Sequence, residues 1–551
     1  MTGEKPSKLI DYVYKPIEFV SETLERKLGI VSVVIISLSA MLGSGLFVLP
    51  ALAMLDMGGP GIWLAYVVAA LVVLPGAISK SELSTAMPTS GGSYVFIERT
   101  YGPLLGTISG LGLWATFLLK AAFALIGFKA YLWVFEELIG ISINVEIAAL
   151  ILLVAIVGVN IMGVTIIKKV QAPIVTSAVG FLVIICIWAV LTMEMDWNRP
   201  IGPGAYGGGW EAVAGTAAFV FVSYSGVTKI AAIAEEIKQP SKNIPSGILI
   251  SLLISTILYA GIAYIMMAAV DPASYETTSG AREDPIYVFA NAVGGKVVGI
   301  IAAGLAVITM TSMALAGIMA ASRYPFAMAR DNLLPEALEN VHSQFQTPHL
   351  AIFGTGLAMA VSIIVLPVQD VAKLASGFQI MIFIIINLAV IILRRASATH
   401  SWYTPEWKSP LFPFFQIMGI MGGGTLVYLM GQKAIIGAAA CCIIGLVTYY
   451  SYGKSHAHPM LTPWRTVRTE FTNSDQYDRE KRWLVFHAAT DKTHPDYLTE
   501  GEFVHAMSII APHYDGFHVR NMFHEIDTNG NGVIDVDEFL QGIEDNFEEQ
   551  E

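Results

Sequence analysis

The chain has 551 residues, of which 54% are hydrophobic and only 14% are charged. Soluble domains carry about 25% charged residues, so this composition excludes a soluble globular protein and indicates a polytopic membrane protein. The net charge of −12 is concentrated at one end, because the segment from Glu470 to Glu551 holds 19 acidic and 5 basic residues. An acidic tail argues against nucleic acid as a partner and is compatible with a cation-binding module.

In chain order, a polar N-terminal segment (residues 1–29) comes first, and its residues Leu9 to Leu28 follow an amphipathic helical pattern. Twelve apolar runs of roughly 20 residues each follow, which predicts an all-α polytopic membrane domain over residues 30–452. Basic residues, Lys80 and Arg99 among them, gather in the loops of one side, so both termini are expected in the cytoplasm, with the chain in the cytoplasmic membrane. The expected spans are 30–55, 61–83, 104–135, 146–165, 170–193, 212–236, 246–270, 290–322, 349–366, 374–394, 412–430 and 434–452.

The first and sixth spans each contain a Gly/Ser segment in mid-span, at 43–45 and 223–226. Unwound backbone inside a membrane is tolerated only where it is buried in protein or lines a cavity. Matching breaks five spans apart favour the inverted repeats of a transporter, although a close helix–helix contact is the alternative for each break alone. The expected substrate ligands are Gly43, Ser44 and Gly45 for a carboxylate, and Ser223, Tyr224, Ser225 and Gly226 for an amine.

Four motifs, in order along the chain, resemble those of amino acid–polyamine–organocation (APC) transporters. The resemblance covers residues 30–452 and implies a leucine-transporter-type fold, with helices 1–5 and 6–10 as inverted repeats plus two helices, and an amino acid or related amine as substrate. Many relatives carry an acidic residue at the position of Thr228, so its absence disfavours a cationic substrate. The motifs are Gly43-Ser44-Gly45-Leu46-Phe47-Val48-Leu49-Pro50; Glu82-Leu83 with Pro88 to Tyr94 and Tyr101-Gly102-Pro103; Ala234 to Pro245; and Ala321-Ser322-Arg323 with Ala329 to Pro335.

Lys120 lies in the middle of the third span, where a lysine facing lipid costs about 2.5–3.5 kcal/mol. It is therefore expected to face protein or water, as a substrate ligand, a proton carrier or a member of a structural pair. In the APC family this part of the third helix lines the substrate cavity. The resemblance also implies a sodium site built from the carbonyls of Ser39 and Leu42 and the hydroxyls of Thr311 and Ser312. The alternative for Thr311 and Ser312 is that each hydroxyl bonds to the carbonyl four residues earlier in its helix. A protonatable Lys120 is the competing idea, so the expected coupling ion is Na⁺ or H⁺.

The tail contains the pattern D-x-[DN]-x-[DN]-G-x₅-E from Asp527 to Glu538, which predicts a Ca²⁺-binding EF-hand loop. A second loop, Asp491 to Glu502, lies 36 residues earlier and keeps the first and twelfth acids, but Pro495 and Asp496 replace a ligand and the glycine. We expect a degenerate partner hand, in a pair over residues 476–551 that follows a cytoplasmic linker over residues 453–475. The expected Ca²⁺ ligands are Asp527, Asn529, Asn531, the Val533 carbonyl, Asp535 and Glu538.

These features predict a secondary active transporter, a symporter of amino acids that works by alternating access and is regulated by cytoplasmic Ca²⁺. Two alternatives remain: a permease for amines or polyamines, and a calcium-linked amino acid sensor without transport. No nucleophile–base set or phosphate-binding loop accompanies the fold, so no enzymatic activity is expected. The expected partners are the substrate, the lipid bilayer and Ca²⁺, and a homodimer is left open.

Overall fold

The computed structural model is almost entirely helical, and the strands in its described part form two antiparallel pairs of two residues each. Most of the predicted N-terminal amphipathic helix lies outside the described residues. The structure describes residues 28–548 except 89–91, 135–136, 138–139, 141–143, 163–164, 233, 235–236, 279, 346, 399, 401, 458–461, 473–481, 484, 487–488, 491–495 and 511–515.

Nine helices in the described residues are long and apolar enough to cross a membrane, and three shorter apolar helices accompany them. Each predicted span contains one of these helices, which confirms the all-α polytopic fold. The longest, α14, joins two helical segments at Gly295, where φ is +75°. Outside the first and sixth spans, the membrane helices are α5 (Ile62–Ala86), α7 (Pro103–Tyr131), α9 (Val145–Met162), α10 (Thr165–Thr192), α13 (Pro240–Ala269), α14 (Pro285–Arg330), α15 (His349–Val365), α16 (Val368–Arg395), α17 (Phe414–Leu429) and α18 (Gln432–Thr448).

The first and sixth spans are each divided into three pieces. The first consists of α2 (Ile30–Met41), α3 (Ser44–Phe47) and α4 (Leu49–Met57). The sixth consists of α11 (Gly209–Val220), the 3₁₀ helix η1 (Phe221–Gly226) and α12 (Val227–Ala232).

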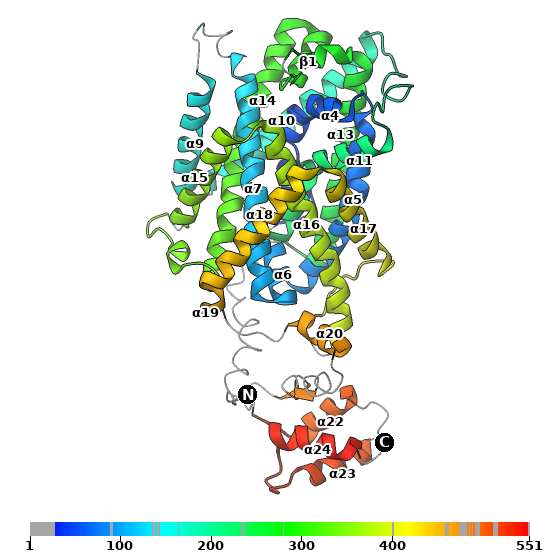
Figure 1. Ribbon diagram of the computed structural model, residues 1–551, viewed down its shortest axis with the longest axis vertical. Helices are drawn as coiled ribbons and strands as arrows, with labels where there is room; N and C mark the ends of the chain where they lie inside the picture. The colour runs from blue at the N-terminus through cyan, green and yellow to red at the C-terminus, as the bar shows by residue number, and fades with distance from the viewer. Residues whose placement is uncertain are drawn as a thin grey trace.

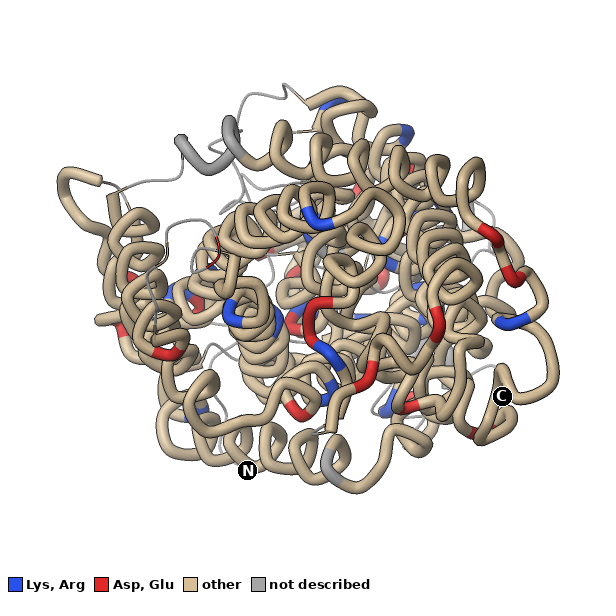
Figure 2. The backbone as a smooth tube through the Cα atoms, turned by 90° about the horizontal axis from the view of Figure 1, so that it is seen from above, with Lys and Arg blue, Asp and Glu red and all other residues tan. Residues whose placement is uncertain are grey.

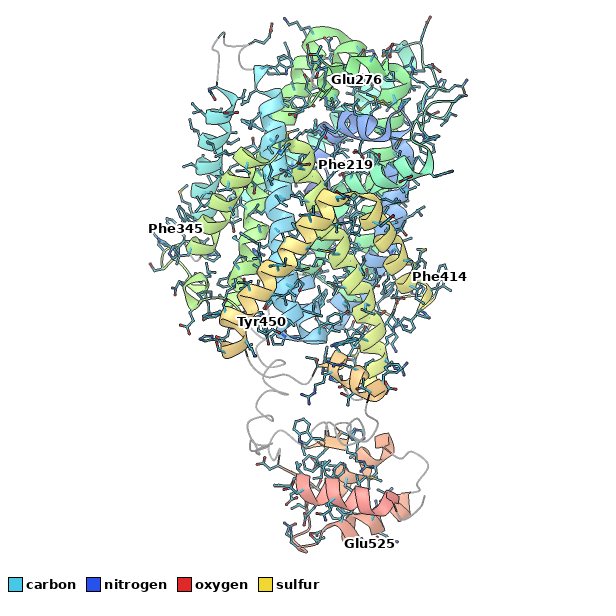
Figure 3. The ribbon with its side chains drawn as sticks, in the orientation of Figure 1. Phe219, Glu276, Phe345, Phe414, Tyr450 and Glu525 are labelled. Carbon is cyan, nitrogen blue, oxygen red and sulfur yellow. The ribbon has the colours of Figure 1, made fainter. Side chains whose placement is uncertain are left out.

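Burial separates the inner helices of the bundle from the outer ones. The apolar window of α7 is 83% buried, whereas those of α9 and the helix that includes α18 are 22% buried, as the arrangement in Figure 1 indicates. Phe219 lies inside the bundle, while Phe414 and Tyr450 lie on its outer surface (Figure 3). Charged residues are few along the helices (Figure 2). The outer apolar side chains fit a lipid environment, which is as apolar as they are.

Lys80 lies inside a membrane helix and not in a loop. Lys80 was counted among the loop residues that set the orientation, and this placement is wrong. Lys80 is inside α5 and is fully buried.

Two short helices lie at the same end of the bundle and contact it there (Figure 1): α6 (Ser93–Tyr101) and α20 (Pro463–Thr472). The remaining short elements of the membrane portion are η3 (Pro272–Tyr275), β1 (Glu276–Thr277), β2 (Gly280–Ala281), η4 (Glu336–Glu339), η5 (Ala396–Ala398), the π-helical turn η6 (Tyr449–Gly453) and α19 (Lys454–His456).

The tail forms a small helical unit with its own apolar core. It contains β3 (Tyr497–Leu498), α22 (Glu500–Ile510), α23 (Gly516–Ile526), β4 (Ile534–Asp535) and α24 (Val536–Glu548). Phe486, Phe503, Phe523 and Phe539 are among the buried residues of this core.

Candidate functional site

The first membrane span is broken at its glycine-containing segment. α2 ends at Met41, Leu42 adopts extended angles (φ −75°, ψ 113°), and α3 begins at Ser44. Gly43 between them has a φ of 177°, which any residue can adopt. A Cβ on Gly43 would overlap the Sδ of Met313 on α14, so a larger residue here requires the Met313 side chain to move.

The two breaks pack directly against each other. A Cβ on Gly45 would lie 2.5 Å from Ser223 Oγ, and a Cβ on Gly226 would lie 2.7 Å from the backbone nitrogen of Met41. Both distances are shorter than carbon atoms tolerate, so only glycine permits this approach. The close contact weighed from the sequence therefore exists, and it joins the first break to the second.

Tyrosine hydroxyls satisfy the carbonyl groups that the breaks free from helical bonding. Tyr66 on α5 donates to the carbonyl oxygen of Gly45 (2.9 Å), and Tyr259 on α13 donates to that of Met41 (2.7 Å). Their rings stack with centroids 5.2 Å apart. Tyr224 in the second break donates to the backbone oxygen of Tyr66 (3.0 Å). The sequence analysis missed Tyr66 and Tyr259, although a tyrosine buried in an apolar span usually marks a hydrogen bond.

Lys120 connects the two breaks from α7. Its Nζ donates to the carbonyl oxygen of Ala40 (2.8 Å) and to the hydroxyl oxygen of Ser225 (2.5 Å), and the residue is 7% exposed. The negative end of the α2 dipole favours a cation at this place. Lys120 therefore faces the protein interior, and its role toward substrate or proton stays a prediction.

The start of α3 is covered by a side chain that the sequence analysis did not identify. The backbone N–H and the hydroxyl of Ser44 donate to Met313 Sδ at 3.4 and 3.6 Å. Sulfur is a weak acceptor, so a carboxylate would bind these donors more strongly. The buried hydroxyl of Ser223, next to Gly45, has no hydrogen-bond partner in the described part of the chain. Weakly satisfied donors of Ser44 and an unsatisfied hydroxyl of Ser223 therefore lie at the junction of the two breaks.

The predicted sodium ligands come from α2 and α14. Thr311 Oγ1 donates to the carbonyl of Val307 (2.8 Å), and Ser39 Oγ donates to that of Ile35 (2.7 Å). These bonds to the carbonyl four residues earlier are the alternative considered from the sequence. They use the hydroxyl protons and leave oxygen lone pairs available, and Ser312 is buried nearby on α14. The sodium site stays a prediction.

A polar cluster lies outside the membrane helices, where α6 meets the end of α14. Tyr94 donates its hydroxyl hydrogen to Asp331 Oδ2 (2.7 Å). Burial and the nearby charge of Asp331 raise the pKa of Glu98 to about 8. Burial also raises the pKa of Asp331. The cluster therefore contains carboxyl groups whose ionisation the fold disfavours.

Side-chain oxygen atoms of the loop from Asp527 to Glu538 accept hydrogen bonds from other groups of the same loop. Asp527 accepts hydrogen bonds from the backbone N–H of Asn531 (3.1 Å) and Gly532 (2.9 Å), and Asn529 Nδ2 donates to Glu538 Oε1 (2.7 Å). Gly532 has a φ of +81°, which provides the sharp turn of an EF-hand loop.

All donors in this loop are hard oxygen atoms, which suit Ca²⁺. Within the described residues, no three His, Cys, Asp or Glu side chains are gathered closely enough to hold a metal. The predicted Ca²⁺ ligand set includes amide oxygens and the Val533 carbonyl as well as carboxylates, and it stays a prediction.

The two strands of the tail pair the eighth residue of the first predicted loop with the eighth residue of the second. Leu498 pairs with Ile534, 36 residues later, and Tyr497 pairs with Asp535. Glu502 accepts from the backbone N–H of Thr499 (2.8 Å), as Glu538 does from that of Asp535 (3.1 Å). Residues 491–495 of the first loop lie outside the described residues.

Comparison with known proteins agrees with this geometry. A family model described as "Amino acid permease" matches residues 28–458, and one described as "EF hand domain" matches residues 518–545. The branched-chain amino acid permease BcaP of Bacillus subtilis is 30% identical over 455 residues, which are 79% of this chain and 95% of the relative.

Two more distant relatives are named for other substrates. The methylthioribose transporter of Bacillus subtilis is 26% identical over 470 residues, 80% of this chain and 98% of the relative. The chloroplastic cationic amino acid transporter 7 of Arabidopsis thaliana is 26% identical over 462 residues, 78% of this chain and 76% of the relative. All three relatives are named as permeases or transporters and none as an enzyme. The chain belongs to the amino acid permease family of the APC superfamily and is a multi-pass membrane protein with a C-terminal EF hand domain.

Proposed function

We propose that the chain is a secondary active transporter of neutral amino acids, which it moves by alternating access around the two breaks. One observation carries the proposal: the breaks face each other across Gly45 and Ser223, and Lys120 joins them from a third helix. A substrate carboxylate would bind the N–H groups at the start of α3. Its amine would bind the oxygen atoms of residues 223–226, where the Ser223 hydroxyl lacks a partner in the described structure.

The substrate class follows from the charges around the breaks. The polar partners that the structure gives the breaks are backbone groups, tyrosine and serine hydroxyls, the Lys120 ammonium and the Met313 sulfur. A cationic side chain needs a carboxylate counter-ion, whereas an aliphatic one needs only apolar walls. The name of the 30% identical relative, a branched-chain amino acid permease, supports leucine, isoleucine or valine as substrate.

Uptake into proteoliposomes containing the purified chain tests this function. Labelled leucine is expected to accumulate, and excess unlabelled isoleucine and valine are expected to compete with it. Arginine, putrescine and methylthioribose are the competitors that represent the cationic, amine and sugar alternatives. Binding of leucine without uptake would support the sensor alternative instead.

We also propose that the end of the bundle bearing α6 and α20 is cytoplasmic, which places both termini in the cytoplasm. The α16 end there carries Arg394 and Arg395 in its last turn, and Arg99 lies in the last turn of α6. The excess of basic residues at cytoplasmic ends supports this orientation.

Calcium regulation is the second part of the proposal, and α20 supports it. Arg395 of α16 forms two bonds of 3.0 Å with Glu470 of α20, and Val467 is buried against Ile392 and Ala396. The Trp464 ring lies 6.3 Å from that of Tyr101 at the end of α6. The linker helix is therefore fastened to the transporter immediately before the predicted EF-hand pair at 476–551.

In sensor EF-hands, Ca²⁺ opens the helix pair and exposes an apolar groove, which accepts an amphipathic helix. We propose that the opened pair captures α20 and releases α16 and α6, which activates transport. The N-terminal segment 9–28, the other candidate for capture, lies almost wholly outside the described residues.

The regulatory proposal is tested by leucine uptake at nanomolar and at millimolar Ca²⁺ inside the vesicles. Uptake by the wild-type chain is expected to rise by roughly 5–150-fold, the usual range of allosteric coupling. Glu538→Gln removes a bidentate calcium ligand and is expected to abolish the response. Equal rates under both conditions in the wild-type chain would show that the tail binds calcium without regulating transport.

A further inference from the structure

Lys80 is the buried ionisable group that the proposed transport site leaves unused. It is 0% exposed, and its Nζ has no hydrogen-bond partner in the described part of the chain. Its neighbours on α5 are satisfied: Ser79 donates to Asn387 (2.8 Å), and Glu82 accepts two bonds from Arg394 (2.8 and 2.7 Å). The Ser84 hydroxyl, one turn later on α5, also lacks a partner in the described part of the chain, but Lys80 is the group of the two that can carry a charge.

The one described contact of the Lys80 ammonium is an aromatic ring on a neighbouring helix. Nζ lies 3.9 Å from the ring centroid of Phe383 on α16. Gly76, one turn earlier on α5, leaves room for the same ring, because a Cβ there would overlap it. A ring face attracts a cation, but it does not replace the three hydrogen bonds that an ammonium makes in water. Taking a single ammonium out of water costs several kcal/mol.

Phe383 also links Lys80 to the second break. Its ring meets that of Phe221, the first residue of η1, edge to face, with centroids 5.5 Å apart. About two turns earlier on α16, Ser376 accepts from the Val222 N–H (3.0 Å) and donates to the Phe219 carbonyl (2.7 Å). A movement of the second break relative to α16 therefore changes the surroundings of Lys80.

No acid on the helices around α5 neutralises Lys80 in the described structure. Glu82 is paired with Arg394, and Asp56 of α4 is paired with Lys373 of α16. The other ionisable residues on elements packed against α5 are Glu211 of α11, Lys229 of α12, Lys242, Tyr259 and Tyr264 of α13, Asp370 and Arg395 of α16, Tyr224 of η1 and Tyr428 of α17.

We propose that Lys80 binds the proton whose movement is coupled to the substrate. When α16 and α5 separate, water reaches the amine, its nitrogen takes a proton and the ammonium is hydrated. When they close, the ammonium loses its water, and its proton passes to water at the cytoplasmic end of α5, which ends six residues after Lys80. The proton affinity then differs between conformations, which is the condition for coupling. Lys120 does not meet this condition in the same way, because its N–H groups already have two acceptors.

This inference rests on the proposed transport function, and its test separates the two. Substrate exchange between the two sides of a proteoliposome needs no driving ion and reports transport alone. Accumulation driven by a pH gradient reports coupling. With one proton per substrate, a gradient of one pH unit supports up to about tenfold accumulation. If the wild-type chain neither exchanges nor accumulates leucine, the transport function is refuted together with this inference.

Lys80→Met, an apolar side chain of similar length, is expected to keep leucine exchange within about twofold of wild type and to lose the pH-driven accumulation. Lys129→Met, which removes a lysine near the end of α7, is the matched control and is expected to keep both. Wild-type accumulation by Lys80→Met, or loss of exchange in a folded Lys80→Met protein, overturns the inference.

A measurement on the wild-type chain does not depend on the folding of that variant. Leucine added to the purified chain in weak buffer is expected to change the pH of the solution, which a pH dye detects. Lys80→Arg, whose guanidinium keeps its proton, is expected to bind leucine without this change. Wild-type leucine binding with no proton movement, or the same proton movement in Lys80→Arg, overturns the proposal.

Discussion

A substitution of Met313, which contacts Ser44, tests the substrate site most directly. Met313 Sδ lies 3.4 Å from the backbone nitrogen of Ser44 and 3.6 Å from its hydroxyl oxygen, so it covers donors that a substrate carboxylate needs. The carboxylate can bind only after the sulfur has moved away. We predict that Met313→Leu tightens leucine binding, because leucine keeps the apolar volume but has no acceptor atom.

The size of the effect follows from the two hydrogen bonds. A protein hydrogen bond contributes about 0.5–1.5 kcal/mol net, and a thioether sulfur is a weak acceptor. The two bonds to Met313 are therefore expected to favour the covered conformation by about 1 kcal/mol in total. Because about 1.4 kcal/mol corresponds to tenfold in affinity, the dissociation constant is expected to fall about fivefold. The exchange of methionine for leucine usually changes stability by less than about 1.5 kcal/mol.

Isothermal titration of leucine into the purified wild-type, Met313→Leu and Met310→Leu chains measures this change. Met310 is the matched control, since it is buried on the same helix but its sulfur lies near Gly127 and not near Ser44. Unchanged or weaker leucine binding in Met313→Leu, with Met310→Leu equal to wild type, would refute the assignment of the carboxylate to the start of α3.

Three further predictions concern the breaks, the cluster at α6 and the coupling ion. Gly45→Ala is expected to abolish leucine binding and to lower the free energy of unfolding by about 1–3 kcal/mol, because the new methyl group overpacks against Ser223. The control is Gly424→Ala, whose new Cβ has no atom within 4 Å. It is expected to bind leucine and to melt as the wild-type chain does. The folded state raises the pKa of Glu98 to about 8. The contribution of the protonated Glu98 carboxyl to stability is therefore full below about pH 4.5 and is lost as the pH rises through 8. Glu98→Gln is expected to melt at a higher temperature than wild type at pH 8.5 and at the same temperature at pH 4.5. If Thr311 and Ser312 bind Na⁺, Thr311→Val abolishes sodium-stimulated uptake, whereas uptake that is equal in sodium and choline eliminates the site.

The sequence predicted the positions of the breaks because unwinding a membrane helix requires local features, clustered Gly and Ser, that a linear pattern displays. Their partners could not be predicted in the same way. Met313 contacts Ser44 across 269 positions of the chain, and the tyrosines that satisfy the freed carbonyls lie on α5 and α13. Which hydroxyl reaches which carbonyl depends on helix rotation and tilt, which packing sets and hydropathy does not encode.

Lys80 shows why a charge near the end of an apolar run is ambiguous. The count of basic residues assigned it to a loop, since a lysine usually marks the boundary of a span, although the predicted span 61–83 already contained it. The helix instead continues to Ala86, and α16 covers the side chain. The EF-hand loop was predictable in detail for the opposite reason: its ligands are close in sequence, and each position of the loop has a defined role.

A single helix connects the three processes proposed for this chain. Ser376 of α16 is bonded to the second break, Phe383 covers Lys80, and Arg395 holds the linker helix α20. The 28 residues of α16 span about 42 Å at about 1.5 Å per residue, most of the thickness of a membrane. A helix transmits a tilt along its whole length because its backbone bonds resist bending. Release of α20 from Arg395 would therefore alter the position of α16 at the substrate and proton sites together, so calcium control would need no separate path to reach either one.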